Sequence, residues 1–306
     1  MNDTLRRELL DLTAEDLRVR TILENDGRLF RGYDPEMEDV HRRNSARLRD
    51  MIAEHGWPTR VLVGDDGVEA AWLVAQHAIS EPSFQRQCLK LLDGAAADGH
   101  VPRWQPAYLL DRIRMFEGWP QMYGTQMAPD DDGVMAVWPI AGRSTLNERR
   151  RRVGLPAFEE RRTAAVPPGA PEDQRADRAS MDRWARKVGW RQRILHLTAE
   201  EAWGAAQRER AYRPASIASE GFIHCSEPQQ VLAVANRLFR GRQDLVLLHI
   251  DITKLTVPGR YENLEGGTQL FPHVYGPLNL EAVVRVTPFH PGPAGDFDHD
   301  DVAAVY

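Results

Sequence analysis

The hydrophobic pattern changes once along this chain, and that change limits the fold more than any other feature. Up to about residue 130, apolar residues recur at helical spacing. After about residue 190, the pattern becomes short apolar runs rich in Leu, Val and Ile, which are typical of strands. A stretch rich in Pro, Ala and charge separates the two halves. The sequence therefore predicts a multidomain protein, with a mostly α first domain and an α+β second domain.

We expect four segments: a helical domain over 1–163, a linker over 164–190, an α+β domain over 191–290 and a flexible tail over 291–306. The linker has no apolar periodicity, and the tail is rich in Pro, Gly and Asp. Thr13 and Asp16 resemble a capping box in the first helix. The periodicity predicts five helices in the first domain, over about 2–25, 39–55, 70–79, 82–97 and 106–116.

Composition excludes several classes of protein. The chain has 306 residues, is 42% hydrophobic and 27% charged, and carries a net charge of −6. No apolar run is long enough to cross a bilayer, and the charged N-terminus lacks a signal core. Its two cysteines are far apart, which favours a reducing cytoplasm over a disulfide scaffold. We therefore expect a cytoplasmic protein with no membrane partner and do not expect nucleic acid as a ligand.

One segment reverses the overall charge. Residues 141–193 hold 14 basic and 7 acidic residues, a net charge of +7, and include the run Glu148-Arg149-Arg150-Arg151-Arg152. Such a run usually forms a solvated face. The alternative is a patch that faces phosphate groups of a nucleotide or nucleic acid.

The densest group of chemically active residues is Tyr261–Leu278 (YENLEGGTQLFPHVYGPL). It combines carboxylates, a Gly-Gly turn, a histidine and tyrosines within eighteen residues. One hypothesis is that it forms a wall of a binding cleft, and the alternative is a hairpin whose polar residues face water. Two upstream stretches favour the cleft, namely Gly221–Ser226 (GFIHCS) and His196-Leu197-Thr198.

The second half of the chain resembles a small bacterial family. The shared motifs read ILHLT, EAW, GFIHCSEPQQV, LVLLHID and YENLEGGTQLFPHVYGPLNLEAVV, over about residues 192–290. The family is a domain of unknown function whose fold is grouped with ADP-ribosyltransferases. The resemblance implies a split, mostly antiparallel sheet and NAD as the substrate, although a fold does not by itself fix a function.

The resemblance also implies roles for individual residues. A carboxylate stabilises the cation that forms on ribose when nicotinamide leaves, and Glu262, with Glu265 as the alternate, matches it. His224 and His273 are further catalytic candidates, since imidazole transfers protons near neutral pH. The candidates for binding the cofactor are His196, Thr198, Ser226 and Tyr275.

The chain departs from the pattern of the wider superfamily. Leu197 stands where Gly is usual, and His224 and His273 have no fixed counterparts in the enzymes that cleave NAD. The two histidines are also similar to the RNA 2′-phosphotransferase branch, whose basic residues grip phosphates. His249 lies in an apolar run, where a structural role is expected.

We considered a metal site formed by histidines of the second half and Glu262. The spacing of His196, His224, His249 and His273 matches no compact ligand motif, so no metal is predicted. Cys225 follows His224, and neighbours on a strand point to opposite faces. A buried structural thiol is therefore expected there.

The first half resembles a second bacterial family of unknown function, over about residues 35–160. The motifs are a GWP turn, an AW…QH helix, a YL.DR helix and a Q.YGTQ loop. If this domain has a site, its candidates are His77, Asp111, Arg112, Tyr123, Thr125 and Gln126. The alternative is structural: Asp111 and Arg112 form an ion pair, and His77 caps a helix.

The leading hypothesis is that the second domain transfers the ADP-ribosyl group of NAD or cleaves NAD. The helical domain would then select the acceptor, which the sequence does not identify. One alternative is a non-catalytic module that binds a nucleotide or another small molecule. The other is an enzyme whose catalytic centre lies in the first domain, around His77 and the YGTQ loop.

Overall fold

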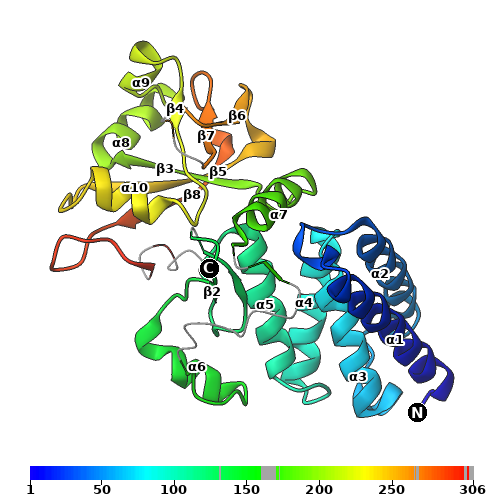
Figure 1. Cartoon of the computed structure of the whole chain (residues 1–306). Helices are drawn as coiled ribbons and strands as arrows, with labels where there is room; N and C mark the ends of the chain where they lie inside the picture. Colours follow the sequence, from blue (N-terminus) through cyan, green and yellow to red (C-terminus); the bar gives the residue numbers. More distant parts are fainter. Residues whose placement is uncertain are drawn as a thin grey trace. The chain divides into compact units, whose positions relative to one another are not determined.

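The computed structural model describes residues 1–130, 132–159, 170–171, 173–264, 266, 269–299 and 302. The chain divides into two compact units (Figure 1). The first comprises Met1–Phe116 and Gln121–Trp190, and the second comprises Glu117–Pro120 and Arg191–Tyr306. The first unit is mostly helical and the second contains the main sheets, as the change of hydrophobic pattern predicts.

The first unit begins with five long helices, in the order that the periodicity predicts (Figure 1). They are α1 (Asp3–Asn25), α2 (Pro35–His55), α3 (Arg60–His77), α4 (Pro82–Ala97) and α5 (Trp104–Glu117). Then come the short antiparallel pair β1 (Met127–Pro129) and β2 (Met135–Val137), and the helices α6 (Leu146–Arg152) and α7 (Arg175–Lys187). Helix α3 begins ten residues earlier than expected and has a kink at Gly64.

Helix α1 does not begin at the capping box expected at Thr13 and Asp16. Its N-cap is Asn2, whose side chain accepts a hydrogen bond from the backbone N–H of Leu5. Thr13 and Asp16 instead lie on the buried stripe of the helix, between Leu9 and Val19. The motif was misread because a Thr and an Asp at this spacing also fit one helix face.

The segment predicted to be a linker contains helix α7. Trp184 and Ala185 of this helix pack into the core of the first unit, and the indole N–H of Trp190 donates to the carbonyl of Ile79 at 2.7 Å. The segment has few apolar residues among many charged ones, so its sequence did not indicate a helix. Trp184, Ala185 and Val188 nevertheless fit one face of a helix. Residues 164–169 and 172 of the predicted linker lie outside the described residues.

The second unit is built on two three-stranded antiparallel sheets (Figure 1). One has the order β3 (Arg193–Ala199), β5 (Leu245–Asp251), β8 (Val283–Phe289). The other has the order β4 (Ile223–His224), β7 (Phe271–Val274), β6 (Gly259–Glu262). The helices α8 (Glu200–Glu209), α9 (Ala215–Ser219) and α10 (Val231–Leu238) connect strands. A bridge between Leu195 and Ser226 joins the two sheets through a pair of 2.8 Å backbone hydrogen bonds.

The central position of strand β5 in its sheet explains why its sequence is almost entirely apolar. This strand is the middle one of three, and apolar clusters cover both of its faces. Val246, Leu248 and Ile250 contribute to one cluster, while Leu245 and Leu247 contribute to the other. Alternation along the strand therefore places apolar side chains on each face.

The segment predicted to be a flexible tail packs on the second unit as far as it is described. The ring of Phe297 stacks on Phe289 with centroids 4.6 Å apart, and only 3% of Phe297 is exposed. The side chain of Asn236 exchanges two hydrogen bonds with the backbone of Phe297, at 2.8 and 2.9 Å. Val302 is buried in the same cluster, so a few apolar contacts hold a segment whose composition otherwise suggests mobility.

Strand β5 also gives the second unit a predicted sensitivity to acid. His249 is buried beside Thr287, at 3.1 Å between Nε2 and Oγ1. Burial, together with the charges of Arg285 and Arg193, lowers the pKa of His249 to about 3. The unfolded chain, with an ordinary pKa of about 6.5, therefore binds a proton that the folded chain does not, and stability falls as the pH drops below that value.

We expect the His249→Gln chain to lose less thermal stability than the wild type between about pH 7 and about pH 5. Glutamine keeps a hydrogen-bonding amide near Thr287 but does not titrate. Melting curves at both pH values measure the difference, with His290→Gln as the control because His290 is exposed. An equal loss of stability in the wild type and His249→Gln would contradict the assignment.

Candidate functional site

The register of strand β7 brings together four of the predicted residues of the second unit. His273 of β7 pairs with His224 of β4 on one side and with Arg260 of β6 on the other. Residues directly opposite each other share one face of a sheet, as do residues two positions apart. The face that carries these three residues therefore also receives Phe222, Glu262 and Tyr275.

The contacts on this face agree with the register. The ring of Phe222 packs against those of His273, His224 and Tyr275, with centroid distances of 4.6, 4.9 and 5.4 Å. The hydroxyl of Tyr275 donates to Glu262 Oε2 at 2.6 Å. This hydrogen bond raises the pKa of Tyr275, so the phenol remains a donor. Oε2 of Glu262 also lies 3.8 Å from Nδ1 of His273.

The residues on this face differ in exposure. The side chain of Glu262 is 28% exposed, whereas that of His273 is 5% exposed. His224 lies at the surface, with Nε2 2.9 Å from a carboxylate oxygen of Glu220. The guanidinium carbon of Arg260 lies 4.8 Å from the centre of the Tyr275 ring. A ligand could therefore reach Glu262, Arg260 and His224, whereas the side chain of His273 is buried.

His196 and Thr198 form a neighbouring network with Tyr212. Nδ1 of His196 donates to the carbonyl of His224 at 2.7 Å, and Nε2 lies 2.8 Å from the hydroxyl of Tyr212. That hydroxyl lies 2.8 Å from the hydroxyl of Thr198. Burial lowers the pKa of His196 to about 4, so the ring is neutral at pH 7. Both ring nitrogens have protein partners, and a ligand would contact His196 only by displacing one of them.

Ser226, another candidate of the second unit, is buried at the bridge between the two sheets. Glu265 lies outside the described residues. Cys225 is buried in the core, and burial raises the pKa of its thiol. The expectation of a structural Cys225 is therefore confirmed. Sequence reasoning missed Arg260 and Tyr212, although Arg260 stands two positions before Glu262, which is the spacing of one strand face.

In the first unit, Asp111 organises the YGTQ loop. Its fully buried carboxylate accepts hydrogen bonds from the backbone N–H groups of Met122, Tyr123 and Thr125, at 2.7 to 3.1 Å, and from the Thr125 hydroxyl at 3.0 Å. Burial raises the pKa of Asp111 to about 6, and these donors oppose the rise. The alternative of an ion pair with Arg112 is wrong because the carboxylate points to the loop backbone.

The remaining candidates of this unit link the loop to helix α3. Arg112 donates to the side-chain oxygen of Gln126 at 3.2 Å and to the carbonyl of Gln76 at 3.0 Å. The amide of Gln126 in turn donates to the Thr125 hydroxyl at 3.1 Å. The side chain of Tyr123 is half-buried, and we find it in none of these bonds. The polar residues of the loop thus extend to the end of the helix that carries His77.

One glycine and two arginines fix the backbone of the same loop and of the segment that follows it. Gly124 has a φ of +67°, and a Cβ atom there would lie 2.8 Å from the ring of Phe158. Arg149 donates to the carbonyls of Met122 and Gly142 at 3.0 and 2.9 Å, and Arg150 donates to that of Pro156 at 2.7 Å. These two arginines of the basic run therefore bind backbone carbonyl groups. Neither of the two interpretations of the run, a solvated face or a phosphate-facing patch, predicted this role.

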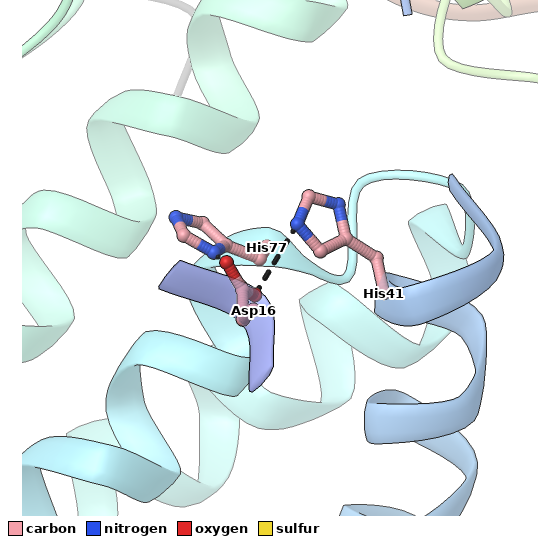
Figure 2. A group of neighbouring side chains, drawn as sticks. All are labelled: Asp16, His41 and His77. Atoms are coloured by element: carbon pink, nitrogen blue, oxygen red, sulfur yellow. Dashed lines mark hydrogen bonds and ion pairs between the residues drawn. The ribbon is translucent and has the colours of Figure 1, made fainter. Parts of the chain in front are cut away.

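A buried cluster joins three helices of the first unit (Figure 2). Oδ2 of Asp16 on α1 lies 2.8 Å from Nδ1 of His77 on α3 and 3.2 Å from Nε2 of His41 on α2. The three side chains are 1%, 14% and 7% exposed, in that order. Nδ1 of His41 is 2.6 Å from the hydroxyl of Tyr33. His77 therefore binds a carboxylate of another helix and does not act as a cap.

In this cluster, the effect of burial on each pKa is opposed by the effect of the neighbouring groups. Burial lowers the pKa of His77 to about 4, although Asp16 works in the opposite direction. Burial favours the neutral form of Asp16, but the two histidines outweigh it and hold the pKa of Asp16 below its usual range. The ligand atoms of Asp16, His41 and His77 lie within 4.8 Å of one another, so these residues could hold a metal ion.

Sequence reasoning named His77 but missed Asp16 and His41. A signal was present, since both occupy positions on a helix face that otherwise carries buried residues such as Val19 and Val40. A carboxylate and an imidazole at core positions need buried partners.

Comparison with known families fits the two resemblances that the motifs suggested. Residues 3–164, more than half of the chain, match a family of unknown function, DUF6624. The chain belongs to this family. Residues 197–286 match a second group, described as a protein of unknown function, DUF952. The DUF6624 segment holds the Asp16 cluster and the YGTQ loop, while the DUF952 match spans all the predicted residues of the second unit except His196.

Similar solved structures cover a smaller share of the chain. Crystal structures of protein CC0527 from Caulobacter crescentus, one of them a double mutant, are 30% and 29% identical, cover 37% of this chain and 99% of theirs, and give a TM-score of 0.34. A solution structure of the same protein is 30% identical and covers 34% of this chain and 90% of its own, with a TM-score of 0.32. No curated protein matches the chain. Among the described residues, no helix combines the length and the apolar character of a membrane span.

We expect Asp111→Asn to destabilise the first unit by roughly 2–4 kcal/mol, because the amide group takes away acceptors that four buried donors need. Thermal or denaturant unfolding measures the change. Asp98→Asn is the matched control, since Asp98 is exposed in the same unit. A stability of Asp111→Asn equal to that of the control would show that the loop does not depend on this carboxylate.

Proposed function

We propose that the second unit binds NAD and breaks the bond between nicotinamide and ribose, passing the ADP-ribosyl group to an acceptor or to water. The carrying observation is the partly exposed carboxylate of Glu262, which the hydroxyl of Tyr275 holds at 2.6 Å on the same sheet face as His224 and Arg260. The resemblance of the motifs to the group with the ADP-ribosyltransferase-like fold supports the proposal, as do the two antiparallel sheets of the unit.

Glu262 would act on the transition state. When nicotinamide leaves, positive charge develops on the ribose, and a fixed carboxylate close to that charge stabilises it. The hydrogen bond from Tyr275 uses Oε2, and Oε1 would face the ribose. Because the bond holds the carboxylate in one orientation before the substrate arrives, little reorganisation is needed during the reaction.

The other residues of the face would bind the rest of the dinucleotide. Arg260, which lies over the Tyr275 ring, supplies a planar cation that suits a phosphate group. His224 is exposed at the edge of the face, where it could bind a phosphate or a ribose hydroxyl. Tyr275 contributes partly exposed aromatic surface, backed by the buried ring of Phe222, and such surface is common in sites for flat ring systems. Selection of the acceptor by the helical unit is part of the proposal.

The test compares the wild type with Glu262→Gln and with Glu209→Gln, an exposed glutamate of the same unit. Calorimetric titration measures NAD binding, and chromatography of the same samples measures free nicotinamide. We expect Glu262→Gln to keep its affinity within about twofold and to lose about 100-fold or more in the rate of nicotinamide release, since the carboxylate acts mainly on the transition state. Glu209→Gln should behave as the wild type.

Each departure from this result has a distinct meaning. Unchanged release in Glu262→Gln would remove Glu262 from the mechanism. Binding without release in the wild type would favour the non-catalytic module that binds a nucleotide. Absence of NAD binding by the wild type would show that NAD is not a substrate of the second unit.

Removal of the Tyr275 hydroxyl tests the orientation of the carboxylate. We expect Tyr275→Phe to lower the rate of nicotinamide release by about tenfold and to leave NAD affinity within about twofold, because Glu262 is retained but its position is less fixed. The same two assays measure it. A loss of affinity with an unchanged rate would place Tyr275 in binding alone.

A further inference from the structure

We propose that Asp16, His41 and His77 bind a divalent transition-metal ion in the first unit. This site is independent of the function proposed for the second unit, and it revises the expectation that the protein uses no metal. The three residues come from α1, α2 and α3, and Figure 2 shows them converging at one point between these helices.

The distances suit a shared ion. All three ligand atoms lie within 4.8 Å of one another, and Oδ2 of Asp16 is 2.8 and 3.2 Å from the two ring nitrogens. Ligand atoms around a tetrahedral zinc ion, with bonds of about 2.0–2.1 Å, lie about 3.3 Å apart. The observed separations differ from this value by no more than about 1.5 Å, so modest rotations of the three side chains would bring the ligand atoms around one ion.

Unsatisfied buried atoms in the cluster point to a ligand. Oδ1 of Asp16 is buried and has no hydrogen-bond partner among the described residues. Nε2 of His41 lies 3.2 Å from Oδ2 of Asp16, but the angles of this contact are not those of a hydrogen bond. Only 1% of the Asp16 side chain is exposed, so bulk water does not solvate it. A buried carboxylate oxygen without a donor is costly, and a network of hydrogen bonds through Oδ2 alone leaves this cost in place. A cation that both oxygens can approach would remove it.

Tyr33 provides the support that a metal-binding histidine usually has. Its hydroxyl lies 2.6 Å from Nδ1 of His41, so Nδ1 would donate its proton to Tyr33 when Nε2 binds the ion. The Tyr33 ring in turn packs edge-on against Trp184, at 4.8 Å between centroids. The orientation of His41 is therefore fixed by groups outside the cluster.

The ligand set indicates the class of ion. Two imidazoles and one carboxylate favour zinc, ferrous iron or a similar transition ion over calcium and magnesium, which prefer oxygen ligands. Three protein ligands leave at least one position for water or a substrate. Arg112 is close enough to act electrostatically on both Asp16 and His77. Its charge opposes the bare cation and favours an anionic fourth ligand.

The test uses the full chain, stripped with a chelator and dialysed, and titrated with Zn²⁺ by calorimetry and with Co²⁺ by visible absorption. We expect one ion per chain in the wild type, with Co²⁺ absorption typical of nitrogen and oxygen ligands. Asp16→Asn and His77→Asn should lose this stoichiometric binding. Tyr33→Phe should bind about 10–100-fold more weakly, as for other residues that orient metal ligands.

Two control variants locate the site. His100→Asn changes an exposed histidine of the first unit, and His224→Asn changes an exposed histidine of the second. Both should bind as the wild type does. Absence of stoichiometric binding in the wild type would overturn the proposal, as would its survival in both ligand variants or its loss in His224→Asn.

A second measurement covers the case in which the ligand variants fail to fold, which circular dichroism detects. Mn²⁺ added to the stripped wild type should broaden the imidazole proton resonances of His41 and His77 before those of other histidines. Broadening that first affects His100 or His224 would place the ion elsewhere and overturn the proposal.

Discussion

The candidate site of the second unit depends on the pairing of one short strand with two neighbours. Strand β7 lies between β4 and β6, and its register places His273 between His224 and Arg260. A slip of one residue would turn the side chain of Glu262 or of His224 to the opposite face. The hydrogen bond between Tyr275 and Glu262, and the contacts of Phe222, exist only in the observed register. The backbone ladder is therefore the scaffold for the proposed chemistry.

In the first unit, the partners of buried carboxylates separate a structural role from a functional one. Asp111 accepts hydrogen bonds from three backbone N–H groups and a hydroxyl, and thus serves the loop that it binds. Asp16 faces two histidines through one oxygen and has no donor for the other among the described residues. The first arrangement is complete without a ligand, whereas the second gains from a cation.

The chain thus combines a DUF6624 segment and a segment similar to DUF952, each with its own group of polar residues. The two proposals rest on different physical features. One depends on a partly exposed carboxylate oriented by a phenol, and the other on buried ligands drawn from three helices. Either can fail without affecting the other, and the variants for each lie in separate units.

The sequence by itself determined the two halves, the five long helices of the first unit and the motifs that carry most of the polar residues of the second sheet. Helical and strand periodicity are local, and motifs such as GFIHCS and FPHVYGPL each lie in or beside one strand. Helix α7 and the packing of Phe297 were missed because each depends on a few apolar residues in a charged or Pro-rich context. Only the tertiary structure brought Asp16 and His41 to His77. Contacts among side chains of three helices follow from how the helices pack, and no spacing along the chain encodes that packing.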